Sequence, residues 1–313
     1  MIQRQAAKKL KELAKGFKAV TVTGPRQSGK TTLVKSVFAR KDYVSLEDPD
    51  SRLFASEDPR GFLGQFENGA VLDEVQRAPE LFSYLQGILD DSDKGGLFIL
   101  TGSCNFTLME SITQSLAGRV GILELAPFSV QELQSGNWLE SAIDSVLFNG
   151  AYPAVFDRKL NVKDWYNGYI TTYIERDVRQ ITNVRYIDEF QKFLGLCAGN
   201  TGQLFDSTRL GNDCGVDHKT IKSWLTILET SYLVFRLRPH SANFRKRLVK
   251  TPKIYFYDTG LACRLLGIEN SKQLQTHPMR GYLFENWVIS EMLKSRYNKG
   301  DRSNLYFWRN HKG

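Results

Sequence analysis

A glycine-rich segment at residues 24–32, GPRQSGKTT, has the residue types and spacing of a phosphate-binding loop. The four fixed positions of the pattern G-x-x-x-x-G-K-[S/T] are held by Gly24, Gly29, Lys30 and Thr31. Glycines let backbone N–H groups wrap around a phosphate, and a following helix directs its positive end at the same anion. Lys30 would neutralise the β- and γ-phosphates of ATP, and the Thr31 hydroxyl would be a ligand of Mg²⁺. The residues predicted to bind the nucleotide are Gly24, Pro25, Arg26, Gln27, Ser28, Gly29, Lys30, Thr31 and Thr32.

Two consecutive carboxylates, Asp73 and Glu74, follow an apolar stretch in VLDEV at residues 71–75. Ionised acids at the end of an apolar strand need partners, so a solvated strand end is the weaker explanation. We expect Asp73 to hold Mg²⁺ through its water shell. Glu74 would orient and polarise the water that attacks the nucleotide. The sequence therefore predicts an ATPase whose cofactors are ATP and Mg²⁺.

A second buried stretch, FILTGSCNF, delivers the polar side chains of Thr101, Ser103 and Asn105 beside the acidic pair. We expect Ser103 to sense the γ-phosphate, and the alternative is that it caps the next helix. Arg119 would supply positive charge to the phosphoryl-transfer transition state, in its own chain or in a neighbouring one. The alternative for Arg119 is an ordinary surface salt bridge.

Strands and helices alternate over residues 1 to about 130, and the strands are continuously apolar. This pattern predicts an α/β fold with a parallel sheet covered on both faces. The predicted strands are 19–24, 42–48, 69–76 and 96–103, and the predicted helices are 1–16, 31–39 and 79–91. The phosphate loop lies between the first strand and the second helix, which is the context that distinguishes it from a plain glycine turn.

The alternation of strands and helices is followed by a mainly helical stretch at residues 138–187, and residues 188–257 have a third pattern. Asp188, Asp206 and Asp217 can each begin a helix, and two strands follow around a basic tip. Three helices followed by a two-stranded hairpin are typical of a winged helix-turn-helix. Beyond them, a helix is expected at 281–296 and a strand at 304–309.

Positive charge is concentrated in the expected hairpin. The net charge is +8, and seven basic residues with no acidic one lie between Ser231 and Tyr257. Such a cluster is typical of a docking surface for an anion. The predicted nucleic-acid contacts are Lys219, Lys222, Arg245, Lys246, Arg247 and Lys250. The alternative is that the winged helix packs on the ATPase and the cations are solvated. The aromatic residues of the second strand, Tyr255, Phe256 and Tyr257, are expected in the core.

Composition limits the class of protein. The chain has 313 residues, 42% hydrophobic and 24% charged, with four scattered cysteines that have no zinc-site spacing. No apolar run reaches the roughly 20 residues of a membrane helix, and the first residues lack the apolar core of a signal peptide. We therefore expect reduced thiols, no membrane partner and a cytoplasmic location.

In order along the chain, GPRQSGKTTL, VLDEVQRAPELF, ILTGSCNF, LAGRV and LAPFSVQEL resemble the prokaryotic AAA-type ATPases that carry a C-terminal domain of unknown function. YIERDVRQI, TIKSWLTILE, KTPKIYFYDTGLA and GYLFENWVISEM resemble that C-terminal domain. The resemblance implies an AAA-like P-loop NTPase domain at 1–135, a helical lid or connector at 136–187 and a winged helix-turn-helix at 188–265. It implies that 266–313 starts a restriction-endonuclease-like domain, in which Glu285 matches the first acidic residue and which is either truncated or has lost its nuclease fold. Metal-dependent cleavage needs clustered carboxylates, so no nuclease activity is expected.

The leading hypothesis is an ATPase that couples its nucleotide state to DNA binding through the winged helix. The competing hypothesis is a signalling or assembly switch that acts on a protein partner or on further copies of itself. A transcription regulator with incidental ATP binding fits less well, because Glu74 equips the site for hydrolysis.

Overall fold

The computed structural model describes residues 2–103, 112, 114–174, 187–240 and 250–309. The chain divides into two compact units. One, the sheet unit, contains residues 3–126 and 296–302, and the other, the helical unit, contains residues 1–2, 127–295 and 303–313. The two long segments of these units meet between residues 126 and 127, whereas the sequence prediction ended the ATPase domain at 135.

The sheet unit is built on five parallel strands in the order β2-β3-β4-β1-β5. The strands are β1 (Ala19–Gly24), β2 (Asp42–Ser45), β3 (Ala70–Asp73), β4 (Phe98–Ser103) and β5 (Val120–Glu124). The parallel α/β sheet predicted from the apolar strands is confirmed. The sequence prediction missed β5, because this edge strand alternates between buried and exposed residues and has no continuous apolar run.

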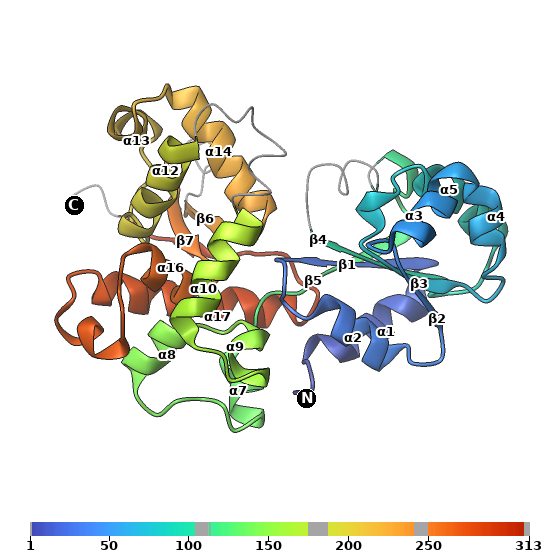
Figure 1. Ribbon diagram of the computed structural model, residues 1–313, viewed down its shortest axis with the longest axis horizontal. Helices are drawn as coiled ribbons and strands as arrows, with labels where there is room; N and C mark the ends of the chain where they lie inside the picture. The colour runs from blue at the N-terminus through green and yellow to red at the C-terminus, as the bar shows by residue number, and fades with distance from the viewer. Residues whose placement is uncertain (1, 104–111, 113, 175–186, 241–249, 310–313) are drawn as a thin grey trace. The chain divides into compact units, whose positions relative to one another are not determined.

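Helices cover both faces of this sheet (Figure 1). One face packs against α1 (Ala6–Gly16) and α2 (Lys30–Val37), and the other packs against α3 (Pro49–Glu57), α4 (Pro59–Gly64) and α5 (Leu81–Asp91). The prediction missed α3 and α4. Each begins with an aspartate–proline pair in which Asp48 or Asp58 accepts a hydrogen bond from a backbone N–H of the first turn. That pairing of an N-cap residue with proline at the first helical position was a readable signal.

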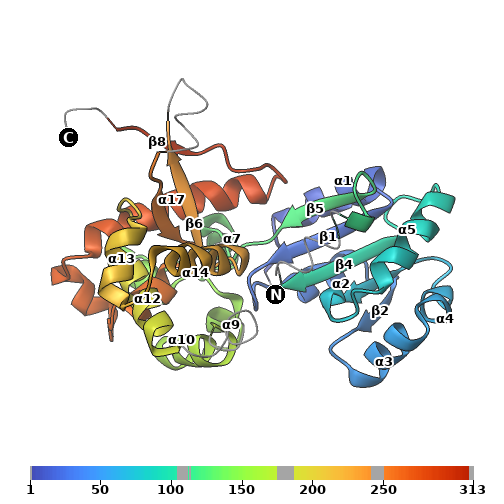
Figure 2. The ribbon, with the colours of Figure 1, turned by 90° about the horizontal axis from the view of Figure 1, so that it is seen from above.

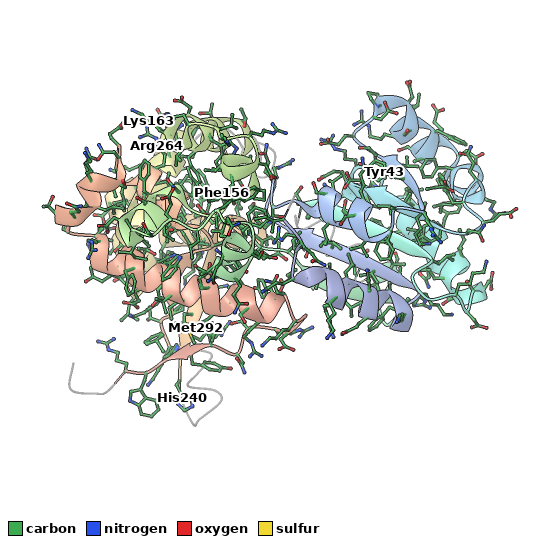
Figure 3. The ribbon with its side chains drawn as sticks, turned by 90° about the horizontal axis from the view of Figure 1, so that it is seen from below. Tyr43, Phe156, Lys163, His240, Arg264 and Met292 are labelled. Atoms are coloured by element: carbon green, nitrogen blue, oxygen red, sulfur yellow. The ribbon has the colours of Figure 1, made fainter. Side chains whose placement is uncertain are left out.

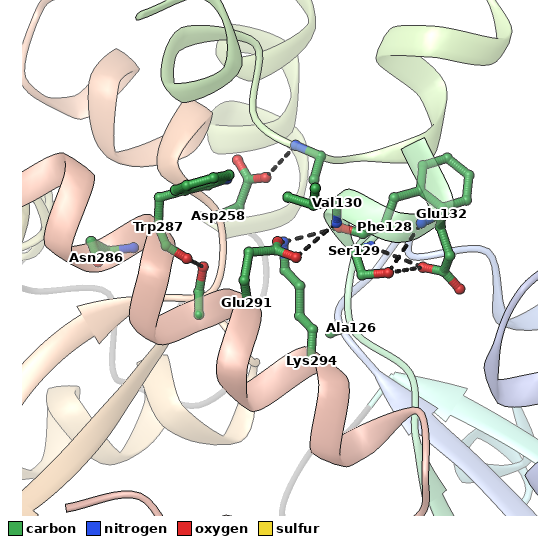
Figure 4. Close-up of polar contacts among 12 residues, drawn as sticks. Ala126, Phe128, Ser129, Val130, Glu132, Asp258, Asn286, Trp287, Glu291 and Lys294 are labelled. Carbon is green, nitrogen blue, oxygen red and sulfur yellow. Dashed lines mark hydrogen bonds and ion pairs between the residues drawn. The ribbon is translucent and has the colours of Figure 1, made fainter. Parts of the chain in front are cut away.

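The helical unit begins with α7 (Val130–Ser135), α8 (Ile143–Asn149), α9 (Pro153–Asp157), α10 (Val162–Tyr169) and the π-helical turn η2 (Ile170–Ile174). Contacts from α17 (Arg280–Tyr297) fix its first residues (Figure 4). Lys294 Nζ donates to the Phe128 carbonyl at 3.0 Å, and the Val130 N–H donates to Glu291 Oε2 at 2.7 Å. Two segments more than 160 residues apart in the sequence are therefore joined by buried or half-buried polar contacts.

Three helices, α12 (Ile187–Gly199), α13 (Ser207–Cys214) and α14 (His218–Thr230), precede an antiparallel strand pair, β6 (Val234–Pro239) and β7 (Lys253–Phe256). Asp206 and Asp217 cap the second and third helices through backbone N–H groups, as predicted. The aromatic residues of β7 and the next position are buried, as expected for core residues.

The chain continues through α16 (Thr259–Leu265) and the 3₁₀ helix η4 (Ser271–Thr276) to α17 and β8 (Tyr306–Phe307). Strand β8 pairs in parallel with β6 (Figure 2). The order in this sheet is β7-β6-β8. The Glu285 carboxylate of α17 accepts hydrogen bonds from Lys253 Nζ at 3.0 Å and from the Tyr255 hydroxyl at 2.6 Å. In the described residues, β8 and most of α17 thus pack within the helical unit, and the start of a restriction-endonuclease-like domain at 266–313 stays a prediction.

Two predictions about the whole chain can also be compared with the structure. Cys197, Cys214 and Cys263 are buried free thiols, and Cys104 lies outside the described residues. Among the helices described, none combines the length and apolarity that a membrane crossing requires.

Candidate functional site

The phosphate-binding loop follows β1, which lies between β4 and β5 in the sheet. In open α/β sheets, ligands bind beyond the carboxyl ends of the strands. Gly24 approaches its neighbour so closely that an added Cβ would lie 2.2 Å from the Leu125 carbonyl oxygen. Gly29 has a φ of 92°, in the left-handed region, and begins α2. Both glycines are therefore required by the local backbone.

The functional groups of the loop point to one place. Lys30 is buried, and its Nζ donates to the carbonyl oxygens of Gly24 at 3.1 Å and Pro25 at 2.9 Å. The ammonium thus lies over the curve of the loop. The Ser28 hydroxyl is fully buried and has no hydrogen-bond partner among the described residues. A buried hydroxyl without a partner costs free energy. The Ser28 hydroxyl is therefore available to bind a phosphate oxygen at this loop.

Asp73 ends β3 and receives three hydroxyl groups. Thr31 Oγ1 donates to its carboxylate with distances of 2.9 and 3.2 Å to the two oxygens, and Thr101 Oγ1 donates to Oδ1. The Tyr43 hydroxyl, on β2, donates to Oδ2 at 2.6 Å; Figure 3 labels this tyrosine. Burial and then the hydrogen bond to Asp73 raise the pKa of Tyr43 above its usual range, so the phenol stays a donor. The structure therefore brings the predicted Thr31 and Asp73 together.

Glu74 follows Asp73 and has a φ of 56°, in the left-handed region that few non-glycine residues adopt. Its backbone N–H donates to Thr101 Oγ1 at 3.3 Å. Its carboxylate accepts hydrogen bonds from Gln76 Nε2 and from Ser103 Oγ, the latter at 3.4 Å. Ser103 therefore lies beside Glu74, although its proposed role as a γ-phosphate sensor stays a prediction.

Arg119 lies at the amino ends of the strands, whereas the phosphate loop follows the carboxyl end of β1. Its carbonyl accepts the N–H of Ala19, the first residue of β1, whereas the loop follows the last. That separation is roughly 16 Å along the strand. The guanidinium pairs with Asp90, with Nη2 2.9 Å from Oδ2, and this contact lowers the pKa of Asp90. The alternative, a surface salt bridge, is thus observed within this chain, and action of Arg119 on the nucleotide of a neighbouring chain stays a prediction.

Two further residues of the site have no counterpart in the sequence prediction. Gln76 contacts Glu74 and Ser103, and its position two residues after the acidic pair was the signal that could have found it. Arg4 is only 8% exposed, and its Nη1 and Nη2 donate at 2.7 Å to the carbonyls of Ser28 and Ala126. No local sequence signal marks Arg4, because its acceptors are backbone carbonyls distant along the chain.

Replacing Arg4 with methionine should lower the free energy of unfolding by about 2–4 kcal/mol, because two buried carbonyls each lose a donor while the apolar volume is kept. Urea unfolding of the whole chain measures the change. Arg60, which is exposed in the same unit, provides the control. An Arg4→Met protein as stable as Arg60→Met would show that the two hydrogen bonds contribute nothing.

The predicted nucleic-acid residues are only partly described. Lys219 and Lys222 are exposed on α14, and Lys250 is exposed where the chain approaches β7. The other three predicted contacts, Arg245, Lys246 and Arg247, lie outside the described residues. The structure therefore leaves this surface a prediction.

Comparisons with known proteins agree with this geometry. Residues 16–134 match the family described as "AAA domain", and residues 140–272 match a "Domain of unknown function (DUF8612)". Uncharacterized proteins of Mycobacterium bovis and Mycobacterium tuberculosis are each 33% identical over 312 residues, which cover 98% of this chain and 68% of theirs. A Walker-type ATPase of Pyrococcus abyssi has a similar structure, with a TM-score of 0.56 and 15% identity, over 85% of this chain and 96% of that one.

At that identity, the archaeal protein shows the fold alone, an α/β P-loop NTPase. The mycobacterial relatives extend over nearly all of this chain at an identity that shows common family membership. This chain therefore belongs, with them, to a family of AAA-type P-loop ATPases in which the AAA domain is followed by a domain of unknown function.

Proposed function

We propose that this protein binds ATP with Mg²⁺ and hydrolyses it at the site formed by the phosphate loop and the ends of β3 and β4. One observation carries the proposal: Thr31, the residue after Lys30, donates directly to Asp73. The loop that would hold the triphosphate and the carboxylate that would hold Mg²⁺ are thus within hydrogen-bond distance. ATP turnover by the purified chain is the first test.

The donor set fits Mg²⁺. This cation prefers oxygen ligands and keeps several waters, so it needs only one or two protein groups beside the phosphates. Thr31 Oγ1 and the Asp73 carboxylate supply such groups at one point, and Tyr43 and Thr101 fix the carboxylate by donating to it. Bound there, Mg²⁺ would neutralise charge on the phosphate oxygens.

The other steps, binding of the phosphates and activation of the attacking water, are assigned to side chains and backbone amides of the chain. Lys30 and the loop amides hold the β- and γ-phosphates, which positions the bond to be broken. Glu74 accepts a proton from the attacking water, whose oxygen bonds to the γ-phosphorus while the bridging oxygen leaves with ADP. Ser103, which lies beside Glu74, would contact the γ-phosphate.

We further propose that the three helices and the hairpin of the helical unit act as a winged helix-turn-helix that binds DNA. Support comes from the exposed lysines of α14 and from the concentration of basic residues around the hairpin. Phosphate contacts of this kind supply affinity that falls steeply with salt. The alternative is that the helical unit binds a protein partner or a second copy of the chain, and that the nucleotide state controls this binding.

Reversing the charge at Arg245, Lys246 and Arg247 to glutamate should weaken DNA binding at least about tenfold at low salt and reduce its salt dependence, because phosphate contacts are lost. Fluorescence anisotropy with a duplex measures affinity, and ATPase rates with and without DNA measure coupling. The matched control reverses Lys8, Lys11 and Lys15, which are exposed on α1. Equal DNA affinity of the first variant and the wild type would overturn the DNA proposal and favour a protein partner.

A further inference from the structure

Gln76 lies in the 3₁₀ turn η1 (Val75–Arg77), two residues after Glu74. Its Nε2 donates to Glu74 Oε2 and lies 3.3 Å from Ser103 Oγ. An ionised carboxylate only accepts hydrogen bonds, so the amide must present its NH₂ group to Glu74. This requirement fixes the direction of the other end of the amide, the carbonyl oxygen Oε1.

Gln76 Oε1 is buried, and it has no hydrogen-bond partner within the part of the chain that the structure describes. A buried acceptor without a donor costs free energy and calls for an explanation. The oxygen belongs to a side chain that already contacts both Glu74 and Ser103. In a hydrolytic site, the water that attacks the phosphate is a small donor suited to such an acceptor.

The main chain of Glu74 is also held in place. Its left-handed φ of 56° is an uncommon conformation for glutamate, and its N–H is engaged by Thr101. The backbone is thereby fixed by β4, while the carboxylate at the end of a long side chain depends on Gln76 and Ser103 for its position. A glutamate that must orient water needs its carboxylate fixed as well as its backbone.

We propose that Gln76 is a further catalytic residue of this site: its Nε2 orients the Glu74 carboxylate, and its Oε1 accepts a hydrogen bond from the attacking water. The inference rests on the proposed ATPase function. In the step, one proton of the water goes to Glu74 while the oxygen forms the new bond to phosphorus. Gln76 gives up no atom or proton, and it fixes the directions of both groups.

Replacing Gln76 with leucine, which keeps most of the volume and removes both hydrogen bonds, should lower kcat about 10- to 100-fold. ATP affinity, measured with a fluorescent analogue, should stay within twofold of the wild type, because the hydrogen bonds of Gln76 among the described residues go to Glu74 and Ser103 and not to the loop. Gln76→Glu should also lower kcat, since a second carboxylate would repel Glu74. The control is Gln65→Leu, an exposed glutamine of the same unit, which should leave kcat unchanged.

A double-mutant cycle separates this role from general structural damage. In a Glu74→Gln background, adding Gln76→Leu should lower the residual single-turnover rate far less than it does in the wild type. Equal losses in the two backgrounds, or a kcat of Gln76→Leu within twofold of wild type, would overturn the proposal while leaving the ATPase function intact. A wild-type protein that binds no nucleotide would overturn both.

Discussion

Replacement of Glu74 by glutamine should leave ATP binding unchanged and lower kcat by about 10²- to 10⁴-fold, the contribution typical of a positioned general base. The substitution keeps the size of the side chain and its capacity to meet Ser103, but an amide cannot accept the proton of the attacking water. Single-turnover hydrolysis of radiolabelled ATP measures the chemical step, and titration with a fluorescent analogue measures binding.

The control for this experiment is Glu67→Gln, an exposed acid of the same unit. Its rate should equal that of the wild type. If Glu74→Gln retains more than a tenth of wild-type turnover, Glu74 is not the base, and the assignment of β3 as the acidic strand of the site fails.

The second large effect is expected at Lys30. Replacing it with alanine should weaken ATP affinity roughly 10- to 150-fold, because hydrogen bonds to charged groups contribute about 1.5–3 kcal/mol each. Hydrolysis should fall below detection, since the γ-phosphate loses its only side-chain ammonium in the predicted set. Isothermal titration with a non-hydrolysable analogue gives the affinity directly.

Lys30 also donates to two carbonyls of its own loop, so the unfolding temperature of Lys30→Ala must be compared with that of the wild type. Lys30→Arg keeps the charge and separates loss of charge from loss of loop support. Lys11→Ala, at an exposed position of α1, is the control for removing one positive charge. ATP affinity within threefold of the wild type in Lys30→Ala would contradict the phosphate-loop assignment.

The sequence predicted the parts of the site that are local. The spacing of Gly24, Gly29 and Lys30 carries its own geometry, because a strand, a glycine turn and a helix of fixed length leave few alternatives. Helices with aspartate caps, such as those begun by Asp206 and Asp217, were predictable for the same reason: cap and capped amides lie within three residues.

The residues that support the site were not predictable, since their partners are distant in the chain. Tyr43 and Thr101 reach Asp73 across 30 and 28 residues, and Arg4 reaches Ala126 across 122. These contacts depend on strand order, which periodicity does not give. The distance of Arg119 from the phosphate loop was not predictable for a related reason: β5 was not recognised as a strand, and it is β5 that puts this arginine at the amino ends of the strands.

The guanidinium of Arg4 has a mechanical consequence. It joins the carbonyl of Ser28, inside the loop that would close on a triphosphate, to the carbonyl of Ala126, after which the chain leaves the sheet unit. Residue 3, which precedes Arg4 in the sequence, is another place where the chain enters that unit. A shift of the loop when a nucleotide binds or leaves would therefore reach, within a few bonds, two of the covalent links between the sheet unit and the rest of the chain.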